Sequence, residues 1–266
     1  MAHQSQIEHN TRVKIYPDGT KDIMVCTRSC FREQGWEAAD REPFRAKALP
    51  PDTQASEPEA VLDEYSNTCS NTKRAQRRAR AAVREIALCN PFSYFVTLTL
   101  DKEKIDRYDM KVITRKLNDW LGNRVRRNGL AYVLVPERHQ DGAIHFHGFF
   151  NNALKVVESG HFDKNGHVIY NLPAWDFGFT TAIELYGDYH SAVGYVCKYI
   201  GKQGEKPGGR WYYSGGALAK PEVHLLDTDW DDFVPEGTHC FEVPETGARF
   251  AMWTERPAQP EAPDTI

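Results

Sequence analysis

Two histidines one residue apart, His145 and His147, lie in an apolar segment at residues 143–150. Such a segment predicts a strand, in which residues two positions apart point to the same face of the sheet. The two imidazoles would then project side by side, and neutral imidazoles are common ligands of divalent metal ions. The same spacing also occurs where two polar residues simply line a solvated face. The pair therefore indicates a metal site only if a further ligand lies nearby.

A carboxylate on the preceding strand is the third candidate ligand. Residues 131–137 form an apolar run ending at Glu137, and the Asp-Gly pair that follows it is typical of a hairpin. A three-residue loop at residues 140–142 would pair Glu137 with His145 and place these two side chains and His147 on one face. A two-residue turn would shift the register by one residue and turn Glu137 to the opposite face. Alternatively, Glu137 is an ordinary hydrated carboxylate at a strand end.

A short helix further along the chain carries candidate nucleophiles. Residues 188–201 begin with a residue able to cap a helix and end at a glycine, which predicts a helix over this span. Tyr195, Lys198 and Tyr199 lie at i, i+3 and i+4, so their side chains share one face. The alternative is that both tyrosines are half-buried core aromatics and that Lys198 extends along the surface.

Together these segments resemble the HUH endonucleases, and specifically the rolling-circle replication initiators of single-stranded DNA phages and plasmids. Residues 95–100, Phe-Val-Thr-Leu-Thr-Leu, resemble the first motif, a central strand. Residues 144–147 resemble the His-hydrophobic-His motif, and Glu137 lies where many members carry a third ligand. Residues 195–199 match the nucleophile motif Tyr-x-x-Lys-Tyr in its two-tyrosine form. The motifs occur in the family's order and span roughly residues 90–220.

The resemblance implies a divalent metal ion, Mg²⁺ or Mn²⁺, bound by Glu137, His145 and His147. Such an ion would polarise and hold the scissile phosphate. Three protein ligands leave positions on an octahedral ion for phosphate oxygens and water. Judged from the ligand types alone, two imidazoles and a carboxylate would equally suit zinc.

The resemblance also implies the reaction. A tyrosine would attack a phosphodiester of single-stranded origin DNA, giving a 5′-phosphotyrosine link and a free 3′-hydroxyl that primes a DNA polymerase. We expect Tyr195 to attack first and Tyr199 to be the second nucleophile. Lys198 would lower the pKa of the tyrosine or neutralise charge on the phosphate. The sequence has no phosphate-binding loop of the Gly-x-x-x-x-Gly-Lys-Ser/Thr type, so we expect no ATP use and a separate host helicase.

The charge distribution agrees with nucleic-acid binding. The net charge of the whole chain is -4, but residues 71–220 carry a net +9, whereas residues 1–70 and 221–266 are acidic. Positive charge in the segment that bears the motifs suits phosphate binding. The residues predicted to contact DNA are Lys73, Arg74, Arg77, Arg78 and Arg210. The alternative for the first four is a solvated helix face, and the aromatic residues after Arg210 either stack on bases or pack at a sheet edge.

The order of predicted elements favours an α+β fold with a central antiparallel sheet and flanking helices, RRM-like or ferredoxin-like as in the HUH nucleases. We expect an N-terminal extension with a linker at 1–65, the nuclease domain at 66–226 and an acidic tail at 227–266. Within these, we predict hairpins near residues 17–19 and 163–167. We expect no membrane span or secretory signal, and hence a cytoplasmic protein, in a bacterial host if phage- or plasmid-encoded.

Cysteine use adds little. In a cytoplasmic protein the six cysteines would be reduced, and a zinc site built from Cys26, Cys30, Cys69 and Cys89 has a spacing that matches no standard finger.

Two other functions remain open. A two-tyrosine transposase or a plasmid relaxase would keep the same chemistry. An RRM-like protein that binds single-stranded nucleic acid without cleaving it belongs to a different class. An EDTA-sensitive covalent adduct with DNA would distinguish the nucleases from the binding protein.

Overall fold

The computed structural model describes residues 8–32, 59–202, 204, 206–244 and 246–257. The chain forms two compact units. One is Ser56–Lys220, and the other combines Met1–Ala55 with Pro221–Ile266.

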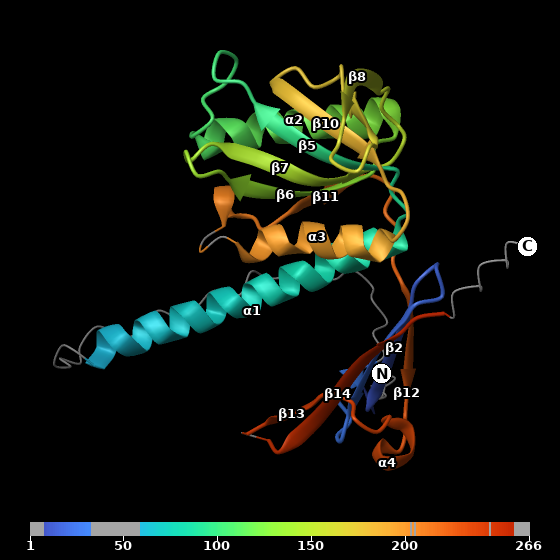
Figure 1. Ribbon diagram of the computed structural model, residues 1–266. Helices are drawn as coiled ribbons and strands as arrows, with labels where there is room; N and C mark the ends of the chain where they lie inside the picture. The colour runs from blue at the N-terminus through green and yellow to red at the C-terminus, as the bar shows by residue number, and fades with distance from the viewer. Residues whose placement is uncertain (1–7, 33–58, 203, 205, 245, 258–266) are drawn as a thin grey trace, which may run out of the picture. The chain divides into compact units, whose positions relative to one another are not determined.

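The Ser56–Lys220 unit is built on an antiparallel seven-stranded sheet (Figure 1). In spatial order its strands are β11 (Tyr213–Gly215), β6 (Tyr132–Arg138), β7 (Ile144–Phe150), β5 (Tyr94–Leu100), β10 (Gly178–Glu184), β9 (Val168–Asn171) and β8 (Val157–Phe162). Its helical elements are α1 (Glu59–Cys89), α2 (Met110–Asn128), α3 (Tyr189–Gly201) and the 3-10 turn η1 (Pro207–Gly209). The hairpin predicted at residues 163–167 is confirmed, because this segment joins β8 to β9.

One face of the sheet forms the main core with α2. Alternate residues of a strand point to opposite faces, so the even-numbered residues of β5 and β7 share this side. Buried side chains from the strands pack with one stripe of the helix: Val96, Leu98, Ile144, Phe146, Ile113, Leu117, Trp120 and Leu121. Asp109 caps α2 by accepting hydrogen bonds from the backbone N–H groups of Lys111 and Val112. This face fixes β5 and β7 in place.

The opposite face is covered by α3, which also packs against α1 (Figure 1). Val193, Val196 and Ile200 form the buried stripe of α3. The two helices are joined where the Tyr189 hydroxyl donates hydrogen bonds to the backbone carbonyls of Ala87 and Asn90, at 3.0 and 3.1 Å. Gly201 allows a close approach, because a Cβ there would lie 1.6 Å from the Arg80 guanidinium. The helix that carries both tyrosines is therefore held from two sides.

The second unit is a separate five-stranded antiparallel sheet in the order β12 (Glu222–Leu226), β2 (Thr11–Ile15), β3 (Lys21–Cys26), β14 (Ala248–Glu255) and β13 (Cys240–Val243). The short strands β1 (Glu8–His9) and β4 (Phe31–Arg32) pair with each other, and α4 (Trp230–Phe233) completes the unit. The hairpin predicted near residues 17–19 is confirmed as the β2–β3 turn, in which Tyr16 N–H donates to the Thr20 carbonyl.

The division of the chain differs from the one expected from the sequence. Strands from the segments at 1–65 and 227–266, predicted as an extension and an acidic tail, lie in one sheet. The boundaries of the larger unit are 56 and 220 rather than 66 and 226. Two of the pairings that close this sheet, β2 with β12 and β3 with β14, join strands far apart in the chain, and acidic composition gives such short strands little local signal. The linker predicted before residue 59 lies outside the described residues.

The predicted fold class, α+β with a central antiparallel sheet and flanking helices, is confirmed. Among the described residues, no helix combines the length and apolar character that crossing a membrane requires.

Candidate functional site

The β6–β7 hairpin has the predicted register. Glu137 pairs with His145, and the three-residue loop closes where His139 N–H donates to the Ala143 carbonyl at 2.8 Å. Gly142 has φ +85°, the left-handed conformation that this loop requires. The Asp141 carboxylate accepts a hydrogen bond from the Ala143 N–H, which lowers the pKa of Asp141. Glu137, His145 and His147 therefore share the face that α3 covers.

His147 is the most enclosed of the three. Its exposed fraction is 8%, its Nε2 lies 2.8 Å from Glu137 Oε2, and its Nδ1 lies 3.1 Å from Thr97 Oγ1. Burial lowers the pKa of His147, although the Glu137 carboxylate opposes the shift. Burial and the nearby His139 also lower the pKa of His145. Both imidazoles are thus favoured in the neutral form that metal binding requires.

Two threonines of β5 lie within hydrogen-bonding distance of the histidine rings. Register pairs Thr97 with His147 and Thr99 with His145, and each threonine hydroxyl lies within 3.5 Å of its histidine Nδ1. A hydroxyl can donate or accept, so it can support either tautomer. Metal-binding histidines commonly have such a partner on the second ring nitrogen. The sequence placed these threonines in a motif without assigning them a role, and the strand register puts each beside a histidine.

The fit to a metal ion is partial. The Glu137 and His147 donor atoms lie 2.8 Å apart, close to the spacing of about 3 Å expected for neighbouring ligands with metal bonds of ~2.1 Å. The His145 ring centroid lies 6.4 Å from that of His147. Within the described parts of the chain, no three His, Cys, Asp or Glu side chains are gathered closely enough to hold an ion as they stand. Metal binding by Glu137, His145 and His147 stays a prediction, and it requires His145 to turn toward the other two.

The two tyrosines of α3 lie directly over this face, but in different environments. The Tyr199 ring stacks on the His147 imidazole with centroids 4.2 Å apart, and only 5% of Tyr199 is exposed. Its hydroxyl donates a hydrogen bond of 2.7 Å to the Tyr195 hydroxyl. Burial and this hydrogen bond raise the pKa of Tyr199 above its ordinary value. Tyr195 is 50% exposed and rests edge-on against Phe95.

The lysine in contact with the site is Lys202 rather than the predicted Lys198. Lys202 Nζ lies 3.2 Å from Glu137 Oε1 and 4.5 Å from the centre of the Tyr199 ring. Lys198 is exposed. Sequence reasoning missed Lys202 because the motif stops at Tyr199.

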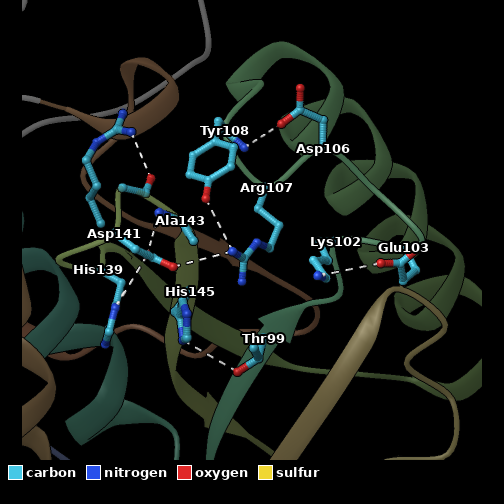
Figure 2. A network of polar contacts seen from close by, with 12 residues as sticks. Thr99, Lys102, Glu103, Asp106, Arg107, Tyr108, His139, Asp141, Ala143 and His145 are labelled. Carbon is cyan, nitrogen blue, oxygen red and sulfur yellow. Dashed lines mark hydrogen bonds and ion pairs between the residues drawn. The ribbon is translucent and has the colours of Figure 1, made fainter.

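A polar network borders the site at the end of β5 (Figure 2). Arg107 Nη2 lies 3.4 Å from Asp141 Oδ2 and donates to the Tyr108 hydroxyl at 3.3 Å. The His139 ring stacks on His145 with centroids 5.2 Å apart. Asp141 thus joins Arg107 to the hairpin loop that sets the register of His145. None of Arg107, Tyr108 and His139 stood out in the sequence.

The predicted DNA-binding residues lie partly around one groove. Lys73, Arg74, Arg77 and Arg78 are exposed on α1, as is Arg210 beyond η1. Arg74 and Arg78 line a groove of about 680 Å³, together with Lys206 and Trp211. Trp211 and Tyr213 are buried, and Tyr213 lies in the edge strand β11. The Arg210 guanidinium lies 5.7 Å from the centre of the Tyr213 ring.

Comparison with known proteins gives one match. Residues 93–204 match the model of a family described as replication-associated protein ORF2. No curated protein and no solved structure matches the chain. The matched segment contains β5, the His145–His147 strand and the tyrosine helix, so the part of the chain that builds this site is similar to a replication-associated family.

Proposed function

We propose that this protein initiates rolling-circle replication by nicking single-stranded origin DNA through a tyrosine and later rejoining strands. The observation that carries the proposal is the stacking of Tyr199 on His147, which joins the tyrosine pair to the Glu137–His147 pair. The family match at residues 93–204 supports a role in replication. A site-specific endonuclease and strand transferase is the activity that accounts for both.

The hydrogen bond between the tyrosines favours Tyr195 as the first nucleophile. Tyr199 donates this bond, so it would stabilise the anion on the Tyr195 oxygen that attack requires. Tyr199 remains protonated as the donor, because burial raises its pKa. Half of Tyr195 is exposed, which gives its own proton a path to solvent and gives DNA access to the oxygen.

The reaction would exchange one ester for another. A bond forms between the Tyr195 oxygen and phosphorus, and the bond from phosphorus to the 3′ oxygen breaks. The 3′ oxygen takes up a proton and becomes the free hydroxyl that a polymerase extends. Because the phosphotyrosine keeps the ester energy, a later 3′-hydroxyl can attack it and reseal a strand without ATP.

We further propose that Glu137, His145 and His147 hold Mg²⁺ or Mn²⁺ during this reaction. The bound ion would neutralise charge on the scissile phosphate. Thr97 and Thr99 would orient the imidazoles, and Lys202 would place a second positive charge beside Glu137. Lys198, which lies outside this cluster, would act on the DNA backbone.

The test is a covalent adduct. Labelled single-stranded oligonucleotides that tile the DNA carrying the gene are incubated with the full chain and Mn²⁺, then resolved under denaturing conditions. We expect an adduct that EDTA abolishes, that Tyr195→Phe reduces strongly and that the double Tyr195→Phe/Tyr199→Phe variant lacks. Tyr186→Phe is the matched control, since Tyr186 is as exposed as Tyr195 and lies outside the site.

The outcomes separate the candidate functions. Strand joining without ATP supports the transfer step, which a transposase or relaxase would share. Tight binding of the oligonucleotides without an adduct under any metal would contradict the nuclease proposal. It would favour the RRM-like binding protein instead.

A further inference from the structure

An exposed aromatic side chain lies in line with the candidate metal ligands. The strand registers pair Glu137 with His145, His145 with Thr99, and Thr99 with Phe179. These four residues form one row across β6, β7, β5 and β10. Directly paired residues in a sheet point to the same face, so Phe179 lies on the face that carries the histidines.

Phe179 is 69% exposed, the largest exposed fraction among the large apolar side chains of the described residues. Burial of such a side chain stabilises a protein by about 1.5–3 kcal/mol, and Phe179 contributes little of this. Single exposed apolar residues are common on protein surfaces, so exposure alone assigns no role. The position of Phe179 in the row is what distinguishes it.

The distances suit a single strand of DNA. Neighbouring strands of a sheet lie about 4.8 Å apart, which places Phe179, two strands from His145, about 10 Å from it along the row. This separation is short enough for a phosphate at His145 and a nearby base at Phe179 to belong to one DNA strand. α3 packs over β6 and β7, so the exposed ring lies beyond the tyrosine helix.

The loop at this end of the row carries charges of both signs. β5 ends at Leu100 and leads into a loop in which exposed Lys102 and Lys104 alternate with Asp101, Glu103 and Asp106. Lys102 pairs with Glu103, and Arg107 pairs with Asp141. Figure 2 shows Thr99, Arg107 and His145 at the same end of the central strands β5 and β7. These charges largely offset one another, so it is the exposed Phe179 ring on the histidine row that favours contact with an unpaired base.

We propose that Phe179 stacks on an unpaired base of the DNA strand next to the scissile phosphate, and thereby positions that phosphate at the histidines. The ligand is a nucleobase of single-stranded DNA. Any of the four bases can stack in this way, because each has a flat aromatic face. This inference rests on the proposed function, which identifies the ligand as single-stranded DNA. It adds a residue that no motif contains.

The test measures binding with the full chain and a fluorescent single-stranded oligonucleotide in EDTA, so that no cleavage occurs. We expect Phe179→Ala to weaken binding about 5- to 150-fold, the loss that aromatic–base stacking gives on alanine substitution. Phe179→Trp should restore binding, because it keeps a flat ring. Phe162→Ala is the matched control: Phe162 is 65% exposed on β8, at the far edge of the same sheet.

An abasic scan identifies the stacked base. One abasic position near the cleaved bond should weaken binding of the wild-type chain but weaken binding of Phe179→Ala no further. Equal binding by Phe179→Ala and wild type, or equal losses in Phe179→Ala and Phe162→Ala, would overturn the inference.

The proposed function fails by a different result, the absence of a wild-type adduct. If wild type forms the adduct but Phe179→Ala binds DNA normally, only the stacking role is wrong. If no adduct forms and Phe179→Ala still weakens binding, the stacking role is upheld in a binding protein.

Discussion

Gly148, directly after the second histidine, lies on β7 against the backbone of β6. A Cβ at Gly148 would lie 1.9 Å from the Val133 carbonyl oxygen and 2.8 Å from the Leu134 Cα. Both obstacles are backbone atoms, so no side-chain rotation can relieve the contact. Gly148→Ala must therefore push the two strands apart.

The size of the effect follows from this geometry. Overpacking in a core costs about 1–3 kcal/mol, and a clash with backbone belongs at the upper end. We expect a loss of about 3 kcal/mol, which in a unit of this size lowers Tm by about 6–12 °C. Gly122→Ala is the control in the opposite direction. Nothing lies within 4 Å of a Cβ at Gly122, and replacing glycine in a helix interior should add about 0.5–1 kcal/mol.

The assay is thermal unfolding of the full chain, monitored by calorimetry so that the transitions of the two units are distinguished. The Gly148→Ala variant should also form less adduct per folded molecule than wild type, since moving β7 separates His147 from Glu137. An unchanged Tm in Gly148→Ala, alongside a raised Tm in Gly122→Ala, would refute the close approach of the two strands. The register that gathers the ligands would then need revision.

Three further changes test other contacts. Burial raises the pKa of Tyr189 to about 12, whereas an unfolded tyrosine titrates near ~10. The stability that the protonated Tyr189 contributes is therefore complete below pH ~10 and is lost as pH rises toward 12. In urea unfolding, Tyr189→Phe should reduce the loss of stability between these two pH values. Thr97→Val should weaken Mn²⁺ binding about 10- to 100-fold in calorimetric titration by leaving His147 Nδ1 without its partner, while Thr181→Val, on the neighbouring strand, should not. Lys202→Met should change the free energy of unfolding by less than about 1 kcal/mol, because its ion pair is exposed, yet reduce adduct formation.

The features that the sequence predicted well are local ones. The hairpin register depends on three loop residues and on Gly142 taking a left-handed conformation, so Glu137 and His145 could be paired from the sequence alone. The tyrosine helix follows from its apolar spacing and its ends. In each case the determining interactions lie within a few residues.

The choice between Lys198 and Lys202 shows where this reasoning was incomplete. Spacing at i, i+3 and i+4 identifies a shared face but not which residue of it meets the sheet. With about 100° per residue, Lys202 lies about 60° around the helix from Tyr199, whereas Lys198 lies about 100° away on the same side. Once Tyr199 is buried against His147, Lys202 is the lysine that reaches Glu137. A helical projection centred on Tyr199 would have indicated this.

The five-stranded sheet was beyond sequence reasoning for a different reason. β2 pairs with β12 and β3 pairs with β14, although more than 200 residues separate the partners. Short strands in acidic segments carry little local signal, and pairing over such distances depends on the whole fold. Composition therefore favoured an extension and a tail where the structure has a sheet.

The two tyrosines differ in a way that bears on the order of attack. They share one helix face, but Tyr199 lies over His147 and donates its hydrogen bond, while Tyr195 accepts it from a half-exposed position. On the proposed mechanism, esterification turns the Tyr195 oxygen into a phosphate ester, which is a weaker acceptor than a phenolate. Tyr199 then loses the phenolate acceptor of its hydrogen bond, and its oxygen becomes available for a second cut. The alternation between two nucleophiles would thus follow from one hydrogen bond, without rearrangement of the sheet beneath it.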